Sequence, residues 1–269
     1  DVETGDELWR WYTVPEPGQP GSETWKDNHN AWKTGGGGIW QTGSYDPETN
    51  LYIVGTGNPV PAYDAEFRPG DNLFGTSILA LDVQTGERVW HFQTVHHDIW
   101  NFDNPAAPVL LDVVVDGRPV PIAVETTKQG FAYTFNRETG EPVWPMEERP
   151  VPQSEIPGEQ LSPTQPFPTK PAAFELQGLT EDDLIDFTPA LRSLALEIAS
   201  EWQLGPMWNP PLHSENPDGK KGSVFCPSQG GGANIPGGGA MDPETGIMYI
   251  ASVKSCAAFV LVPGIDRDA

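Results

Sequence analysis

A nine-residue pattern returns along the chain and constrains the fold more than any other feature of the sequence. It reads DVETGDELW from Asp1, DVQTGERVW from Asp82 and NRETGEPVW from Asn136, with the Thr-Gly pair and the tryptophan at the same spacing. Two further copies, DPETNLYIV from Asp46 and DPETGIMYI from Asp242, keep the turn and replace the tryptophan with alternating apolar residues. Such recurrence of one short unit is typical of a repeat architecture.

Each copy has the composition of a tight turn between two strands. The opening Asp or Asn can accept hydrogen bonds from the turn backbone, and the glycine can adopt a positive φ. We expect the tryptophan to fold back against its own turn, where a large ring becomes buried. The 29 glycines and 29 prolines also favour short strands joined by turns. Repeated hairpins of this kind predict an all-β chain with a β-propeller architecture.

The net charge of −23, from 38 acidic and 15 basic residues, disfavours binding to nucleic acids and to anionic lipids. A basic partner and a merely solvated acidic surface both agree with it. The longest apolar tract, near CAAFVLVPG, is too short to span a bilayer. No secretory signal is visible and the chain starts inside a repeat, so we expect a fragment or a processed product.

Cys226 and Cys256 are the two cysteines, 30 positions apart, and they match no metal-binding spacing. They are either buried thiols or one disulfide. The glycine-rich sequence around both favours the disulfide.

The segment ALDVQTGERVW, from Ala80 to Trp90, resembles the tryptophan-docking motif A-x-D-x-x-T-G-x-x-x-W of the pyrroloquinoline quinone (PQQ)-dependent dehydrogenases. Segments similar to those of this family follow in family order along nearly the whole chain: WKTGGGGIW, GTGNP, RPGDN, QTVHHDIW, TTKQGFAYTFNRETGEPVW, SPTQPFPTKP and GGGANIPGGG. The resemblance implies an eight-bladed propeller, of which residues 1–269 form one partial domain of about four blades. The remaining blades would come from sequence outside this chain.

The resemblance also implies an activity. The family oxidises alcohols, polyols or sugars by hydride transfer to PQQ, beside a bound Ca²⁺ or lanthanide ion, and passes the electrons to a cytochrome or quinone acceptor. It works in the periplasm, and any membrane association here would come from segments outside this sequence. The alternative is a catalytically inactive propeller that binds a ligand or a protein.

One segment interrupts the strand pattern. Between Thr180 and Trp202 the apolar residues follow helical spacing, Thr180 or Thr188 can cap a helix, and Pro189 suits a first turn. The proline-rich stretch before it reads as an extended loop. We expect residues 150–215 to form an insertion over one face of the propeller, with a structural role and no chemistry.

Four glycines, Gly35 to Gly38, precede Trp40 and leave room for a flat ligand near its indole. By themselves these residues also fit a turn beside a core aromatic. The resemblance places Trp40 beneath the PQQ ring. Asn58, 18 positions later in GTGNP, fits either a common turn or a ligand to a hard cation. The resemblance makes it a metal ligand.

The loop HHDIWNFD, from His96 to Asp103, departs from the family. The family motif H-D-x-W-D ends on the aspartate that takes the proton from the substrate hydroxyl and approaches the metal. Asn101 stands there in this chain, and an amide cannot accept that proton, although its oxygen can bind a metal. Asp103 is the nearest replacement, as base and as metal ligand, because in an extended segment it faces the same side as Asn101. His96, His97 and Asp98 are expected to be loop anchors.

Two further residues match cofactor-binding positions of the family. Lys128 in TTKQGF stands where a Lys or Arg contacts the quinone oxygens, although alone it also fits a surface lysine at a strand end. Asn234 in GGGAN matches a turn that approaches PQQ from another blade. We expect Trp40, Asn58, Asn101 and Lys128 to converge at one end of the propeller axis.

Overall fold

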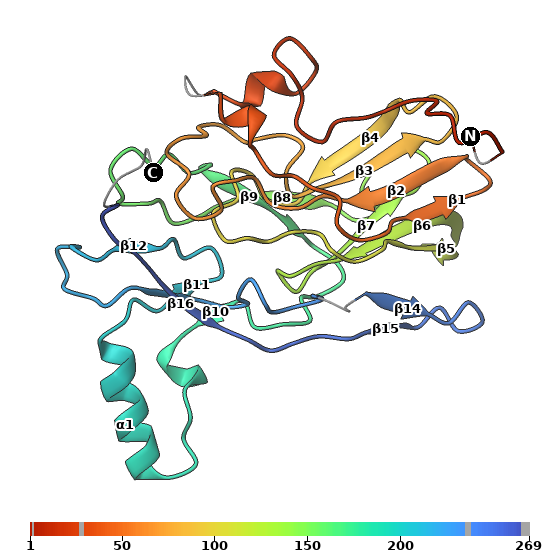
Figure 1. Cartoon of the computed structure of the whole chain (residues 1–269). Coiled ribbons are helices and arrows are strands. Elements are labelled where there is room, and N and C mark those ends of the chain that lie inside the picture. The colour runs from red at the N-terminus through yellow and green to blue at the C-terminus, as the bar shows by residue number, and fades with distance from the viewer. Residues whose placement is uncertain (2, 27–29, 235–237, 265–269) are drawn as a thin grey trace.

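The computed structural model describes residues 1, 3–26, 30–234 and 238–264. Short strands in several small sheets dominate, as the all-β prediction requires (Figure 1). The first sheet is antiparallel throughout and contains, in order, β1 (Ser44–Asp46), β2 (Leu51–Gly55), β3 (Ser77–Asp82) and β4 (Arg88–Gln93). The second is antiparallel and contains β5 (Val109–Val115), β6 (Arg118–Thr126) and β7 (Ala132–Asn136).

The remaining strands form smaller sheets. They are β8 (Met146–Pro150) with β9 (Thr164–Pro168); β10 (Gly178–Leu179) with β11 (Gly205–Pro206); β12 (Leu212–His213), β16 (Ala257–Leu261) and β13 (Ser223–Phe225); and β14 (Gly239–Met241) with β15 (Met248–Ile250). Three short 3₁₀ turns lie at Ser22–Thr24, Ala31–Lys33 and Glu181–Asp183.

The β5–β7 sheet lies between two others and makes the core continuous. On one face its Phe135 meets Phe92 of β4, with ring centroids 5.0 Å apart. On the other face Ile122 and Val124 pack against methionines of β14 and β15. Face-to-face packing of small antiparallel sheets is the propeller arrangement that the repeat predicts.

Trp9 and Trp90 do not dock on their own turns, so that expectation is wrong for these two residues. The Nε1 atom of Trp9 donates a hydrogen bond to the carbonyl oxygen of Val83 at 2.8 Å, and that of Trp90 donates to Arg137 at 2.9 Å. Each ring therefore packs on the turn of a later copy. Trp144 is half-buried. The physical reason is that β4 directs Trp90 toward the neighbouring sheet, so the contact joins two sheets instead of closing one hairpin.

The predicted helix is present as α1 (Pro189–Ser200). Thr188 caps it by accepting a hydrogen bond from Leu191 N at 3.2 Å, and Pro189 occupies the first turn. No residue of α1, all of which the structure describes, is buried. Figure 1 shows the helix projecting from the rest of the molecule. The helix therefore contributes nothing to the core, and the bounds of the insertion stay a prediction.

Cys226 and Cys256 form a disulfide, which joins the residue after β13 to the residue before β16. This resolves the two alternatives that the sequence left open. Within the described residues, no helix is long and apolar enough to cross a membrane.

Candidate active site

The loop from Thr94 to Asn104 is shaped by one buried carboxylate. Asp98 accepts hydrogen bonds from Trp100 N and from Phe102 N, each at 2.8 Å, and from Thr76 Oγ1 at 2.8 Å. Burial raises the pKa of Asp98, and these hydrogen bonds oppose the rise. Asn101, between the two bound amides, has a φ of 61°, a conformation that asparagine tolerates better than most residues. The loop therefore presents Asn101 in a fixed backbone geometry.

Lys128 connects this loop to the turn between β6 and β7. Its Nζ lies 2.5 Å from Asp103 Oδ2 and 3.1 Å from both the carbonyl oxygen and Oδ1 of Asn101. The side chains of Lys128 and Asp103 are only 5% and 8% exposed. Asn101 and Asp103 thus both contact the same ammonium group. The positive φ of Asn101 means that the segment is not extended, so the alternation of strand side chains is not the cause of this shared contact. Lys128 is not the surface lysine that its sequence position alone would allow.

Asn58 contacts the same carboxylate from another direction, and Trp40 lies close to it, across Gly57. The second oxygen of Asp103, Oδ1, accepts a hydrogen bond from Asn58 N at 2.5 Å. A Cβ on Gly57 would lie 2.9 Å from this oxygen and 3.4 Å from Trp40 Nε1, so only glycine fits between them. Trp40 is 43% exposed, which leaves part of its ring accessible to a ligand. The structure therefore brings Trp40, Asn58, Asn101, Asp103 and Lys128 into one site.

The glycine run before Trp40 has a partly different purpose from the expected one. A Cβ on Gly35 would meet the Trp25 ring at 2.6 Å, and one on Gly36 would meet the carbonyl oxygen of Asn58 at 2.5 Å. Gly38 alone of the four has nothing within 4 Å of its Cβ position. Gly35 therefore makes room for the Trp25 ring and Gly36 for the Asn58 backbone, and Gly38 has open space at its Cβ position.

Asn234 approaches the site through the backbone of its turn. Ala233 N donates to the carbonyl oxygen of Thr127 at 3.0 Å, and a Cβ on Gly232 would meet the Lys128 carbonyl oxygen at 2.3 Å. The Asn234 side chain itself donates a long hydrogen bond, 3.4 Å, to the carbonyl oxygen of Gln229. The turn thus packs behind Lys128, and among the described residues no hydrogen bond joins the Asn234 side chain to Asp103 or Asn101.

Sequence reasoning missed Tyr63. Burial raises the pKa of its hydroxyl, and a hydrogen bond with the Asn101 side chain acts in the opposite direction. The Tyr63 ring also packs on Phe259, with centroids 4.6 Å apart. Tyr63 lies in a loop without repeat or periodicity, so only the fold reveals that it belongs to the site.

The oxygen atoms of the site suit a hard cation. Asn58 uses its amide nitrogen to donate to Pro59 O at 2.7 Å, so its side-chain oxygen is the atom suited to a metal. Asp103 adds a carboxylate and Asn101 an amide oxygen. No group of three or more His, Cys, Asp or Glu side chains positioned for a metal occurs in the described part of the chain. These residues thus fit part of a coordination sphere, with one carboxylate and two amides.

The family described as "PQQ: Glucose/ethanol/alcohol dehydrogenase, beta-propeller domain" matches residues 1–268. The chain belongs to this family. It is 35% identical over 192 residues to the glycerol dehydrogenase large subunit of Gluconobacter oxydans, covering 70% of this chain and 25% of that protein. It is 34% identical over 168 residues to the quinoprotein glucose dehydrogenase of Escherichia coli, covering 62% and 21%.

A solved structure agrees in fold. The quinohemoprotein alcohol dehydrogenase of Comamonas testosteroni superposes with a TM-score of 0.61 at 25% identity, covering 93% of this chain and 32% of that one. The chain thus spans between a fifth and a third of the length of these relatives. The β-propeller prediction and the family resemblance are confirmed, whereas the roles of the individual site residues stay predictions.

Proposed function

We propose that the protein is a PQQ- and metal-dependent dehydrogenase that oxidises an alcohol, a polyol or a sugar. The single observation that supports this best is the meeting of Lys128, Asp103, Asn101 and Asn58, from three separate loops, in one buried polar site beside Trp40. Its relatives include a glycerol and a glucose dehydrogenase, which fits CH–OH donors as substrates. The electron acceptor would be a cytochrome or a quinone, and the location the periplasm.

The residues of the site divide into three tasks. Trp40 would support the face of PQQ, and Lys128 would contact the quinone oxygens. The turn that contains Asn234 would support Lys128 from behind. Asn58, Asn101 and Asp103 would hold a Ca²⁺ or lanthanide ion through oxygen atoms. When bound, PQQ would supply the hydride acceptor and the metal would polarise oxygen atoms near it.

Asp103 is the residue of this site that can act as the base. Its carboxylate holds two hydrogen bonds in the structure, one per oxygen, and retains further acceptor positions for a substrate hydroxyl. Asn101 has the side-chain oxygen to orient that hydroxyl but cannot take its proton. The proton would therefore pass from the substrate oxygen to Asp103, while Lys128 and Asn58 N hold the carboxylate in place.

The second candidate is an inactive propeller that binds a ligand or a protein, and the amide at Asn101 favours it. Activity of the full-length protein decides between them. The protein is loaded with PQQ and with Ca²⁺ or a lanthanide, and reduction of an artificial dye acceptor is followed over a panel of alcohols, polyols and sugars. Metal- and PQQ-dependent turnover of at least one substrate is expected. Absence of turnover in the native protein, with activity appearing in Asn101→Asp, would establish the inactive alternative.

A further inference from the structure

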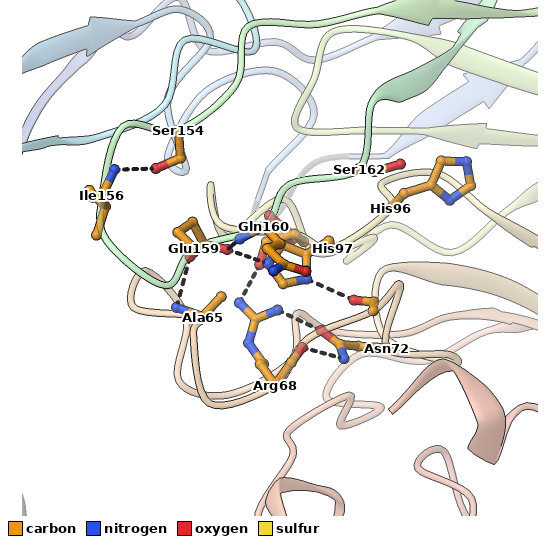
Figure 2. Close-up of polar contacts among 12 residues, drawn as sticks. Ala65, Arg68, Asn72, His96, His97, Ser154, Ile156, Glu159, Gln160 and Ser162 are labelled. Atoms are coloured by element: carbon orange, nitrogen blue, oxygen red, sulfur yellow. Dashed lines mark hydrogen bonds and ion pairs between the residues drawn. The ribbon is translucent and has the colours of Figure 1, made fainter. Parts of the chain in front are cut away.

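A buried carboxylate outside the site holds the loop that contains Asn101 and Asp103. Glu159, between β8 and β9, has a side chain that is only 3% exposed. Its Oε1 lies 2.6 Å from His97 Nε2, and its Oε2 accepts a hydrogen bond from Ala65 N at 3.2 Å (Figure 2). Burial raises the pKa of Glu159, but the hydrogen bond and charge of His97 outweigh it, so the pKa lies below its ordinary value. Glu159 therefore joins three segments that are distant in sequence.

His97 transmits this contact to the backbone of the loop. Its second ring nitrogen, Nδ1, lies 2.7 Å from the carbonyl oxygen of Gly70, so the ring is fixed from both sides. His97 has a φ of 48°, which places it in the left-handed region that costs free energy for a residue with a side chain. The two hydrogen bonds of the ring offset that cost and hold the backbone in this turn.

Arg68 fixes the next residue of the same loop. Its fully buried guanidinium donates to the carbonyl oxygen of Asp98 at 2.6 Å. It also donates to Asn72 Oδ1 at 2.8 Å (Figure 2). Asp98 in turn binds the amides on both sides of Asn101. Contacts thus hold successive parts of the loop: Glu159 binds His97, Arg68 binds the carbonyl oxygen of Asp98, and the Asp98 carboxylate binds the amides of Trp100 and Phe102, which flank Asn101.

We propose that Glu159 is a positioning residue for Asn101 and Asp103, and that it acts through His97. The assignment rests on the proposed function, because positioning matters only if these two residues act on metal and substrate. The proline-rich segment that contains Glu159 then has a role beyond that of a structural strap. Groups that bond directly to metal ligands typically influence metal affinity or activity by about 10- to 100-fold, and because Glu159 acts through His97 we expect an effect at the lower end of that range.

The test compares Glu159→Gln with Glu155→Gln in the full-length protein. Both substitutions remove one negative charge from the same loop, but Glu155 is exposed. Amide hydrogen exchange of residues 96–104 is measured without PQQ or metal, Tb³⁺ affinity by luminescence, and kcat and KM with PQQ bound. For Glu159→Gln we expect exchange at Trp100 and Phe102 to accelerate, Tb³⁺ affinity and kcat to fall about tenfold, and the substrate KM to stay within about twofold. Glu155→Gln should match the wild type in all four.

A double substitution tests the route through His97. If Glu159 acts through it, His97→Gln should reproduce the faster exchange, and Glu159→Gln added to it should have little further effect. Additive effects, or exchange in Glu159→Gln equal to that in Glu155→Gln, would overturn the proposal. Should Glu159→Gln fail to fold, unchanged exchange in His97→Gln would overturn it as well. A wild type without Tb³⁺ binding or turnover would contradict the proposed function. The hydrogen-exchange comparison would still test whether Glu159 holds residues 96–104 through His97.

Discussion

The ammonium nitrogen of Lys128 lies 2.5 Å from Oδ2 of Asp103, and both side chains are almost completely buried. Removing two charges from water is costly, so each group depends on the other for its stability in the interior. The pair also joins the β6–β7 turn to the loop that contains Asn101. The ion pair that connects these two segments thus includes Asp103, the proposed base.

Loss of the ammonium should destabilise the fold strongly. Lys128→Met leaves Asp103 buried without its cation, and breaking a buried pair in this way costs about 3–5 kcal/mol of the free energy of unfolding. Chemical denaturation measures the loss. Lys221→Met is the matched control, because Lys221 pairs with Glu201 at 2.5 Å on the exposed surface, where a pair contributes about 1 kcal/mol or less. An equal effect of both substitutions would contradict the buried pair.

Asp103 and Asn101 should respond to substitution in opposite ways. Asp103→Asn removes the proton acceptor and also leaves Lys128 buried without its carboxylate. The rate is therefore compared per folded, PQQ-loaded molecule, and it should fall by about 10²- to 10⁴-fold. Asn101→Asp adds a second carboxylate beside Lys128 and should preserve or raise turnover. Steady-state kinetics and a PQQ-binding titration check both. An unchanged rate in Asp103→Asn would show that another group takes the proton.

Local sequence patterns predicted the elements whose contacts are local. The Asp-x-x-Thr-Gly turns predicted the hairpins, and Thr188 with Pro189 predicted the start of α1, because capping and turn chemistry act within a few residues. The docking of Trp90 on the turn after Arg137 was predicted incorrectly. Spacing within one repeat does not tell which neighbouring sheet receives a side chain.

The site shows the same division. Family motifs identified Asn58, Asn101 and Lys128 as candidates, and the fold brings them together. Tyr63 and Glu159 were not found, because each lies in an irregular loop and gains its partners through contacts with residues at least 38 positions away in sequence. Neither hydrophobic periodicity nor turn chemistry reports such contacts.

The docking of the tryptophan on a neighbouring turn can be tested with two equivalent glycines. Gly140 and Gly246 occupy the same position of the repeat, with φ of 74° and 69°. A Cβ on Gly140 would meet the Trp90 ring at 2.6 Å, whereas one on Gly246 meets nothing within 4 Å. Both alanine substitutions should cost about 1 kcal/mol for the backbone conformation, and Gly140→Ala about 1–3 kcal/mol more. Equal losses of unfolding free energy would mean that the ring does not pack there.

Glu125 of β6 predicts a pH dependence of stability. Its side chain is 1% exposed, and neither carboxylate oxygen has a hydrogen-bond partner within the described part of the chain. Burial alone raises its pKa well above the ordinary value. In the unfolded chain the pKa of this carboxyl is about 4.3. The folded protein therefore binds the proton more tightly than the unfolded chain does. This group contributes most to stability below that pH, and its contribution falls as the pH rises toward the folded pKa, by about 1.4 kcal/mol per unit.

Glu125→Gln removes this titration and leaves the side chain nearly isosteric. Relative to the wild type, the variant should gain stability steadily as the pH is raised above about 4.3, with the smallest difference at the acidic end. Denaturation midpoints measured for both proteins from pH 4 to pH 8 give the comparison. Glu87→Gln, which changes an exposed carboxyl, serves as the control and should follow the wild type throughout. A pH-independent difference between Glu125→Gln and the wild type would show that Glu125 titrates alike in the folded and unfolded states, as it would if water reached the carboxyl in the folded protein.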